Sequence, residues 1–162
     1  MPGIVVALGE FSTDRLRAAV QKLVHLCSHR SEAVSLSAEL ALGWAGPPER
    51  IDSRVWADQA GHEVHVWRYG HAFKDAATPQ PIDAAQILRD YMSEGIKACY
   101  EYEGGFVIVV ADLRLQRLYV VPDRLSTQPL YYTRSGDGFV IGPEVKALYA
   151  AGCGWVSRSP NM

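Results

Sequence analysis

The first residues of the chain are the ones whose types could do chemistry. The sequence opens with MPGI, directly ahead of the strand-like apolar run 4–8. Aminopeptidases generally remove a methionine that precedes a small residue, so we expect the mature chain to begin at Pro2. Proline has no side-chain nucleophile. Its terminal amine can act as a general base where burial and a nearby cation lower the pKa of that amine.

The cysteines and histidines offer no second reactive constellation. Cys27 falls on the inward stripe of the first predicted helix, which indicates a buried core thiol rather than a nucleophile. The three cysteines form no CxxC pair and leave an odd count, which favours a reducing compartment, and we therefore predict a cytoplasmic protein. The one histidine pair with helical spacing, His25 and His29, has only Glu32 nearby, so we predict no metal site.

The length and composition limit the class of protein. A chain of 162 residues fits about one domain, and 48% hydrophobic with 21% charged residues is ordinary for a globular protein. The net charge of −2 provides no basic field for nucleic acid or for an anionic membrane. No apolar run approaches the ~20 residues of a membrane helix, and the opening lacks the pattern of a secretory signal.

The first half of the chain alternates between helix and strand signals. A short apolar strand over 3–8 is followed by a predicted helix over about 13–29, capped by the Ser-Thr-Asp cluster at 12–14. Period-2 alternation predicts a half-buried strand over 33–46, and GWAGPPERID, residues 43–52, is interpreted as a loop. The segment 53–70 predicts a hairpin that turns near Gly61.

The second half is rich in strands. We predict a helix over about 83–95 with Asp83 as its N-cap, then a doubly covered strand over 105–113 and a partner strand over 117–123. A hairpin over 129–142 and a short helix over 143–151 follow. Roughly eight strands and three helices in this order predict two mainly antiparallel sheets with helices outside. This is an α+β fold of the αββα four-layer sandwich type.

Residues 103–148 carry a long ungapped pattern of charged and aromatic anchors. The segment resembles the end of the glutaminase domain of asparagine synthetase-type proteins, which has a DGMFAFALWD-like strand, an ARDRxGxKPLYY turn and a SEIKAL helix. The matching residues are Glu103, Gly104, Phe106, Asp112, Asp123, Arg124, Leu125, Pro129, Leu130, Tyr131, Tyr132, Glu144, Lys146, Ala147 and Leu148. Upstream, three segments of this chain align with further family motifs. HRSE aligns with HRGPD, LALGWAG with ALGHRRL, and RYGHAFKD with NGEIYN.

This resemblance implies a class II glutamine amidotransferase domain with the N-terminal nucleophile (Ntn) hydrolase fold. That fold is the αββα sandwich, which the order of elements also predicts. The resemblance implies a domain over 1–150 and a tail, or the start of an interdomain linker, over 151–162.

The resemblance also implies that the catalytic machinery is degenerate. Members of the family begin Met-Cys-Gly-Ile, and their terminal cysteine attacks glutamine, but Pro2 occupies that position here. Tyr69-Gly70 stands where the family has the Asn-Gly that stabilises the oxyanion, and the segment 43–46 lacks the arginine that holds the substrate carboxylate. Asp83 matches the acid that holds the substrate ammonium, although a helix N-cap is the simpler interpretation.

Further residues are assigned by their places in the same motifs. Tyr69, Gly70, His71 and Asp83 are predicted to form a residual binding pocket. Asp123 and Arg124 are expected to be structural, as a buried pair that fixes the turn before Pro129.

The functional prediction is a non-catalytic glutaminase-like domain of an ATP-dependent enzyme that forms amides or lactams. It would act as the scaffold or partner of a synthetase domain, in the same or a separate chain, and a homodimer is a further alternative. ATP and Mg²⁺ would belong to that synthetase domain, and no cofactor is expected in this chain. A rival prediction is a tautomerase-like enzyme with Pro2 as general base, because the opening 1–23 resembles such enzymes.

Overall fold

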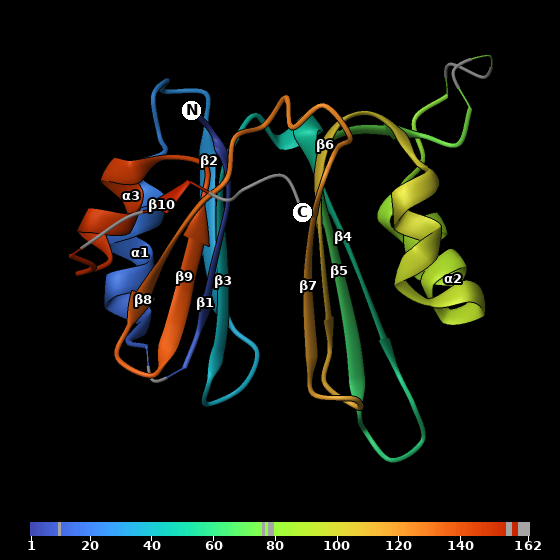
Figure 1. The fold of residues 1–162 in the computed structure, drawn as a ribbon, viewed down its shortest axis with the longest axis horizontal. Helices are drawn as coiled ribbons and strands as arrows, with labels where there is room; N and C mark the ends of the chain where they lie inside the picture. Colours follow the sequence, from blue (N-terminus) through green and yellow to red (C-terminus); the bar gives the residue numbers. More distant parts are fainter. Residues whose placement is uncertain (10, 76, 78–79, 155–156, 159–162) are drawn as a thin grey trace. The chain divides into compact units, whose positions relative to one another are not determined.

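The computed structural model describes residues 1–9, 11–75, 77, 80–154 and 157–158 of the chain (Figure 1). The chain divides into two compact units. The first consists of Met1–Pro48 and Pro129–Met162, and the second consists of Glu49–Gln128. Each unit holds one antiparallel sheet and its own helices, and each is described by itself.

The first unit is built on a six-stranded sheet with the order β10-β8-β9-β1-β3-β2. Its strands are β1 Gly3–Leu8, β2 Arg30–Ser35, β3 Leu40–Gly46, β8 Tyr131–Ser135, β9 Gly138–Gly142 and β10 Ser157–Arg158. Two helices, α1 Thr13–Gln21 and α3 Val145–Ala150, belong to this unit and contact each other. β1 pairs with β3 on one side and with β9 on the other, so residue 2 leads directly into a central strand.

The core of the first unit forms where the apolar stripe of α1 meets the sheet. Leu16, Ala19 and Val20 are buried and share a cluster with Val5 of β1 and Leu148 of α3. The predicted cap is confirmed, because the Ser12 hydroxyl accepts a hydrogen bond from the Arg15 N–H at 3.2 Å. The 3.6-residue spacing of apolar side chains thus places one helix face against the sheet.

The first helix is shorter than predicted. α1 ends at Gln21, and the backbone continues in turns in which Leu23 N–H bonds the Val20 carbonyl at 2.9 Å. Leu23 is nevertheless fully buried, so a turn satisfies the apolar spacing that favoured more helix. The prediction of a buried Cys27 is wrong, because Cys27 lies beyond these turns and is exposed.

The predicted single strand over 33–46 is wrong as well. It is a hairpin of β2 and β3, closed by hydrogen bonds from the N–H groups of Leu36 and Ser37 to the Leu40 carbonyl at 2.8 and 3.1 Å. The Ser37 hydroxyl accepts the Glu39 N–H at 3.2 Å and fixes the turn. Serine hydroxyls replace the glycine or proline that usually marks a hairpin, which is why alternation alone predicted one strand.

The second unit holds a four-stranded sheet with the order β4-β5-β6-β7. Its strands are β4 Ile51–Ala57, β5 Glu63–Phe73, β6 Glu103–Asp112 and β7 Arg117–Pro122. The helix α2, Ala84–Glu94, continues into the 3₁₀ helix η2, Gly95–Glu101, and another 3₁₀ turn, η1 Pro48–Arg50, precedes β4. β5 and β6 pair over ten residues, from Val64 opposite Asp112 to Phe73 opposite Glu103.

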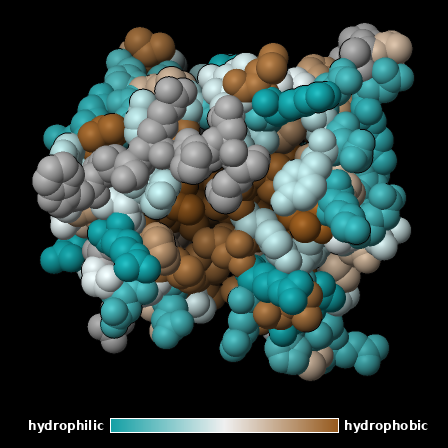
Figure 2. Space-filling model, viewed as in Figure 1, coloured by the Kyte–Doolittle hydropathy of each residue, from teal (hydrophilic) through white to brown (hydrophobic). Residues whose placement is uncertain are grey.

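One face of this sheet packs on α2. Ile87 and Tyr91 of α2 are buried in one cluster with Val64 and Val66 of β5 and Ile108 of β6. The outward face of the helix is mostly hydrophilic, as the space-filling view shows at the right (Figure 2). The period-2 pattern of β5 therefore turns its even-numbered residues toward α2.

Most of the predicted elements are confirmed. The helices over 83–95 and 143–151, the strand over 105–113 and the hairpins over 53–70 and 129–142 all form close to their predicted bounds. The loop predicted over 43–52 is much shorter, because β3 runs to Gly46 and β4 begins at Ile51. Ten strands occur in the described ranges instead of roughly eight, since β2 and β10 are additional.

The predicted tail falls partly outside the described residues, which exclude 155–156 and 159–162. Within it, Ser157–Arg158 pair with β8 as β10. The domain boundary near residue 150 remains a prediction. Across the described ranges, no helix combines the length and the apolar character needed to cross a membrane.

Candidate functional site

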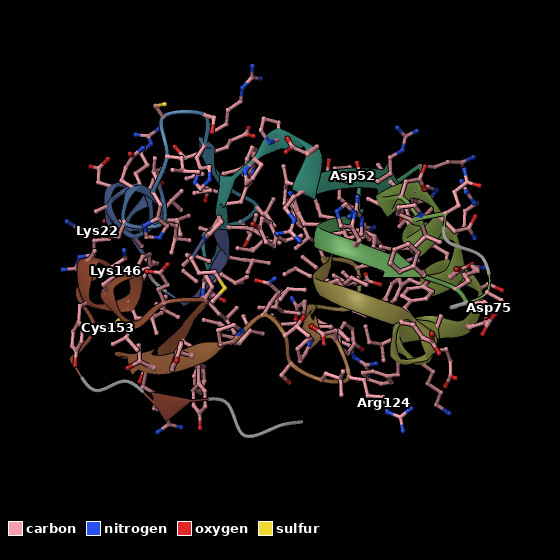
Figure 3. All side chains as sticks on the ribbon, turned by 90° about the horizontal axis from the view of Figure 1, so that it is seen from above. Lys22, Asp52, Asp75, Arg124, Lys146 and Cys153 are labelled. Atoms are coloured by element: carbon pink, nitrogen blue, oxygen red, sulfur yellow. The ribbon has the colours of Figure 1, made fainter. Side chains whose placement is uncertain are left out.

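The N-terminal end of β1 holds the first group of candidate residues. Pro2 is half-buried directly ahead of the strand. The α-amino group of Met1 forms an ion pair with Glu144 and lies 2.6 Å from Nε2 of His25. The Glu144 carboxylate also lies 2.7 Å from His25 Nε2 and 3.0 Å from Nζ of Lys146, the residue labelled in Figure 3. One largely buried carboxylate therefore has three basic neighbours.

This surrounding changes the protonation of the amine. Burial and the positive charge of Lys146 lower the pKa of the α-amino group, although the Glu144 carboxylate favours its charged form. Burial also lowers the pKa of His25, and the charges of the α-amino group, Lys146 and His29 act in the same direction. An amine with a lowered pKa beside a neutral imidazole can accept and release a proton, but this group contains no thiol or hydroxyl nucleophile in the described part of the chain.

Tyr69, Gly70 and His71 are consecutive residues of β5. Gly70 has a positive φ of +91°, and a Cβ at this position would overlap the backbone carbonyl of Gly105 on β6. Glycine is therefore required here by the backbone. Its survival in the family motif reflects this close strand contact and is not by itself a sign of activity.

A buried arginine, Arg68, lies beside these residues, and the sequence analysis did not find it. Only 6% of Arg68 is exposed, and its Nη1 donates a hydrogen bond to the Gly70 carbonyl. Its Nη2 lies 4.0 Å from Oδ2 of Asp52, labelled in Figure 3, and this oxygen accepts the Ala84 N–H at 2.7 Å. Arg68 thus connects the Gly70 backbone with the first turn of α2.

The signal for Arg68 was present in the sequence. It lies in phase with the buried Val64 and Val66, and a charged residue on a buried face normally has a specific partner. Burial lowers the pKa of Arg68, while the carboxylates of Asp52 and Asp83 act in the opposite direction. Its Nε has no hydrogen-bond partner among the described residues.

A second arginine, Arg50, lies over the ring of Tyr69, with its guanidinium carbon 5.9 Å from the ring centroid. Burial raises the pKa of the Tyr69 phenol, which stays protonated at neutral pH. Burial and the charges of Arg50 and Arg68 lower the pKa of His71 and keep its imidazole neutral. Two guanidinium groups, those of Arg50 and Arg68, therefore lie near this part of β5, together with the carboxylates of Asp52 and Asp83 that act on Arg68.

At the end of β3, two of the positions over 43–46 leave little room for an arginine. A Cβ on Gly43 would overlap the Val20 side chain, and Ala45 is fully buried. Both positions lie inside the first unit, where a guanidinium would lose its hydration. The nearby sequence position with a partly exposed arginine is Arg50, in the turn that follows.

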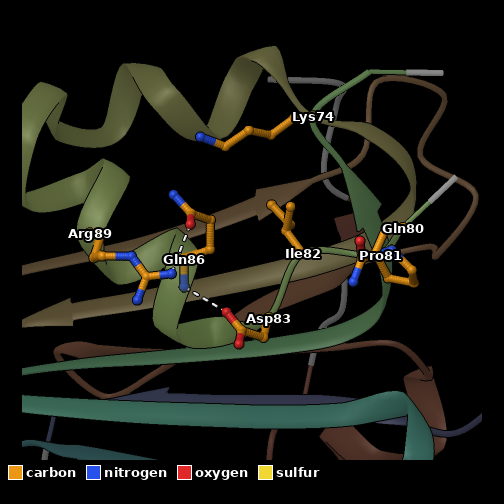
Figure 4. Close-up of a pocket in the computed structure, with 7 residues that line it drawn as sticks. All are labelled: Lys74, Gln80, Pro81, Ile82, Asp83, Gln86 and Arg89. Atoms are coloured by element: carbon orange, nitrogen blue, oxygen red, sulfur yellow. Dashed lines mark hydrogen bonds between the residues drawn. The ribbon is translucent and has the colours of Figure 1, made fainter. Parts of the chain in front are cut away.

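Asp83 is the N-cap of α2, as predicted from the sequence. Its Oδ1 accepts the Gln86 N–H at 2.7 Å, and Figure 4 shows this hydrogen bond. Asp83 also lines a pocket of about 370 Å³ with Lys74, Gln80, Pro81, Ile82, Gln86 and Arg89 (Figure 4). Tyr69, Gly70 and His71 are not among the residues that line this pocket, and a residual pocket that holds all four residues stays a prediction.

The predicted buried pair of Asp123 and Arg124 is wrong. Asp123 is buried, but its carboxylate accepts the backbone N–H groups of Leu125 and Thr127, each at 3.1 Å, and the Thr127 hydroxyl at 2.8 Å. Arg124 is exposed and extends from the surface (Figure 3). A short carboxylate can satisfy the backbone of its own turn, so the cation is not needed there.

Two of the three cysteines are buried. Cys99 and Cys153 are buried, and burial together with Asp90 raises the pKa of the Cys99 thiol to about 12. Cys27 is exposed in the segment after α1. Among the described residues, no three His, Cys, Asp or Glu side chains gather as metal ligands would.

Comparison with known structures defines the class of the fold. The chain is similar to the glutamine phosphoribosylpyrophosphate (PRPP) amidotransferase from B. subtilis, solved in complex with ADP and GMP. The TM-score is 0.73 over 96% of this chain and 44% of that chain, at 12% sequence identity. At this identity the likeness shows the fold, and it confirms the predicted α+β sandwich of two antiparallel sheets, the Ntn-hydrolase-like class.

Sequence comparison identifies the family. Residues 67–158 match the family described as the glutamine amidotransferase domain, and this match covers more than half of the chain. The chain therefore belongs to the glutamine amidotransferase domain family. The resemblance to the glutaminase domain of the asparagine synthetase family is confirmed.

Two relatives come from Bacillus subtilis (strain 168). The chain is 32% identical over 82 residues to asparagine synthetase (glutamine-hydrolyzing) 3, which covers 50% of this chain and 12% of that protein. It is 26% identical over 88 residues to asparagine synthetase (glutamine-hydrolyzing) 2, which covers 54% of this chain and 11% of that protein. The matches thus span only about an eighth of the relatives' length.

Proposed function

We propose that this chain is a glutaminase-like domain that does not hydrolyse glutamine and that serves as scaffold or partner of an ATP-dependent synthetase domain. The observation that carries this proposal is Pro2, at the position of the family's nucleophile. Amide hydrolysis through an acyl-enzyme needs a side-chain or terminal nucleophile that can later leave. A proline acylated on its ring nitrogen would be a stable amide, so the cycle would stop after one turnover.

The rest of the site supports the same conclusion. Tyr69 replaces the asparagine whose amide would stabilise the oxyanion, and loss of one such donor costs ~10²–10³ in rate. Cys99 offers no substitute, because burial keeps its thiol protonated. Arg50 and Arg68 bring positive charge to β5, but charge alone supplies no nucleophile.

The scaffold role is supported by the names of the relatives. Both are glutamine-hydrolysing asparagine synthetases, and the matched segment is a small part of each. We infer that a synthetase domain, on the same or a separate chain, binds ATP and Mg²⁺ and forms the amide or lactam bond. The glutaminase-like domain would then contribute binding surface and stability, and ammonia or another amine would come from elsewhere.

The hydrolysis part of the proposal is tested by ammonia release. We expect the chain, incubated with glutamine, to release ammonia no faster than the buffer control. Pro2→Cys restores the thiol and Pro2→Ala is its matched control, and we expect both to remain inactive because 43–46 still lack the arginine. Glutamine-dependent ammonia release that a thiol alkylator abolishes in the unmodified chain would refute the proposal.

The partner part is tested with a synthetase domain of the asparagine synthetase type. We expect the two to elute together in size-exclusion chromatography, and the complex to form an amide from free ammonia, or a lactam from an amine of the substrate itself, but no product with nitrogen taken from glutamine. Separate elution at all concentrations, with full synthetase activity in the absence of this chain, would contradict the scaffold role.

A second candidate function is a proton-transfer enzyme that uses the Pro2 amine as general base. Its support is the pKa of the Met1 α-amino group, which is lowered beside His25 and Glu144, and we infer that the Pro2 amine would meet similar surroundings once Met1 is removed. After removal of Met1, an NMR titration should place the pKa of the Pro2 amine below its usual ~8. The chain should also speed the enol–keto exchange of a phenylpyruvate-like probe. An ordinary pKa with no exchange would leave Pro2 without a chemical role.

A further inference from the structure

The outer edge of β4 is the most open edge in the second unit. β4 is the terminal strand of its sheet, and all residues from Ser53 to Ala57 are exposed. Val55 and Trp56 are large apolar side chains, 47% and 36% exposed, on this strand. Edge strands of this kind present unpaired backbone N–H and C=O groups and pair readily with another chain unless they are protected.

The opposite edge of the same sheet is protected. β7 ends at Pro122, which cannot donate a hydrogen bond to a further strand, and most of its residues are half-buried or buried. β4 contains no proline and is seven residues long. The two edges therefore differ in exposure and in proline content, two features that decide whether a strand can accept a partner.

The order of side chains on β4 suits pairing with a second copy of itself. A two-fold axis normal to the sheet makes two β4 strands antiparallel and keeps the same face of both sheets on one side. Centring this axis on Ser53 places Asp52 opposite Arg54 of the other copy, twice. It also places Ile51 opposite Val55, so that an apolar pair forms on the other face.

The alternative register is unfavourable. Centring the axis on Arg54 would place two guanidinium groups opposite each other and Asp52 opposite Trp56. Like charges directly across a strand pair are destabilising, whereas opposite charges and apolar pairs are stabilising. Charge complementarity therefore selects the register centred on Ser53.

The charged groups are available for this pairing. Asp52 accepts the Ala84 N–H and faces Arg68 through Oδ2, while its Oδ1 has no hydrogen-bond partner among the described residues. Arg54 is exposed and forms no ion pair within the described ranges. A guanidinium from a second copy can thus reach Oδ1 without disturbing the contact that holds α2.

We propose that two copies of this chain associate through β4, antiparallel and in the register centred on Ser53, and so join their four-stranded sheets into one of eight strands. The occupant of the open edge is a second copy of the chain. This inference concerns assembly and is independent of whether glutamine is hydrolysed.

The charges on β4 have a competing explanation, in which Asp52 and Arg54 keep the edge monomeric by solvating it. The two explanations predict opposite effects of the same substitutions. If Arg54 protects the edge, Arg54→Val promotes association and Arg54→Glu leaves the chain monomeric, as it already was. If Arg54 pairs with Asp52, Arg54→Glu separates an existing dimer.

The first experiment measures the mass of the full chain by size-exclusion chromatography with light scattering. The protein concentration runs from about 1 µM to about 1 mM, the range in which dimers with small interfaces form. We expect a concentration-dependent dimer. Arg54→Glu should raise the dimer Kd about tenfold or more, since two attractive pairs become repulsive. Arg54→Lys, the matched control, should stay within a few-fold of the unmodified chain. A monomer throughout, or a dimer unaffected by Arg54→Glu, would overturn the proposal.

The second experiment tests the register by a disulfide. Paired residues lie ~4.5–5.5 Å apart between Cα atoms, within the ~4.4–6.8 Å range of a disulfide. In a Cys27→Ser background, Ser53→Cys should give a covalent dimer under mild oxidation. Val55→Cys, at a position that is also exposed, should not, because the two residues 55 would be displaced by four steps along the strands, ~14 Å. Equal cross-linking of both variants, or none at position 53, would contradict the register.

Discussion

Replacement of Asp112 by asparagine is expected to destabilise the second unit severely. Asp112 ends β6 fully buried, and its carboxylate accepts the Tyr91 hydroxyl at 2.9 Å. It also accepts Nε and Nη2 of Arg114, at 3.0 and 2.7 Å, and the backbone N–H groups of Arg114 and Leu115, at 3.1 and 3.2 Å. This single side chain therefore joins α2, β6 and the turn before β7.

The magnitude follows from the number and kind of donors. Asp112→Asn removes the negative charge and replaces one carboxylate oxygen by an N–H₂ group. This group would face either the donors to Oδ1 or the donors to Oδ2, so at least one cationic or hydroxyl donor loses its acceptor. Breaking a buried ion pair from one side costs about 3–5 kcal/mol. Arg114 is partly exposed and can regain water, so we expect a loss of about 3 kcal/mol in the free energy of unfolding. Tyr91→Phe removes one donor and should cost about 1.5 kcal/mol.

The pH dependence gives an independent check. Burial alone would raise the pKa of Asp112, but the hydrogen bonds from Arg114 and Tyr91 outweigh it and lower the pKa below its ordinary value. The stability that this group contributes is therefore present above its unfolded pKa of ~3.9 and is lost as the pH falls through its lower folded pKa. The difference in the free energy of unfolding between the unmodified chain and Asp112→Asn should therefore narrow below about pH 4.

Urea denaturation followed by tryptophan fluorescence measures these differences, because the guanidinium carbon of Arg114 lies 5.1 Å from the Trp56 ring centroid. The stabilising role assigned to Asp112 is refuted if Asp112→Asn costs less than about 1 kcal/mol in the free energy of unfolding at pH 7. It is refuted equally if Tyr91→Phe is as damaging as Asp112→Asn, or if the gap between the chains is unchanged at low pH.

Three further predictions concern local geometry and exposure. Ser126 has a φ of +49° where the family motif has glycine, so Ser126→Gly should be more stable than Ser126→Ala by about 1 kcal/mol in urea denaturation; equal stability would exclude backbone strain there. Asp123→Ala should cost about 2 kcal/mol in the same assay, whereas Arg124→Ala should be neutral; a comparable loss for both substitutions would restore the buried-pair interpretation. Cys27 should react with maleimide in the native chain and Cys99 only after unfolding, as peptide mass mapping would show; rapid native labelling of Cys99 would contradict its burial.

The elements that sequence alone predicted well are those whose signals are local. Asp83 precedes an apolar stripe at helical spacing, so both the start of α2 and its cap could be predicted. The doubly covered β6 is recognisable as a continuous apolar run. The β2–β3 hairpin was missed because its turn is held by serine hydroxyls, and α1 was overextended because the buried Leu23 sits on a turn that mimics the helical period.

The candidate site was predicted less well because its geometry depends on contacts between distant segments. The motifs located Tyr69, Gly70 and Asp83, but they did not indicate that Asp83 lines a pocket with Gln86 and Arg89 of α2. Arg68 acts through Gly70 and through Asp52 of another strand, and strand periodicity gives only the face on which it lies. The pairing of Asp123 with its own backbone could not be separated from an ion pair with Arg124 by residue type alone.

The division of the chain has a consequence for the order in which it folds. The second unit is one continuous segment, Glu49–Gln128, so all of its strands have been synthesised before β8 and β9 are made. The first unit has to wait, because the central strand β1 pairs with β9 through Val6 opposite Ile141, a contact between nearly opposite ends of the sequence. Such non-local pairing is slow to form. We therefore expect pulsed hydrogen exchange to protect β5 and β6 first, while β1, although synthesised earliest, is among the last strands to be protected on both of its edges.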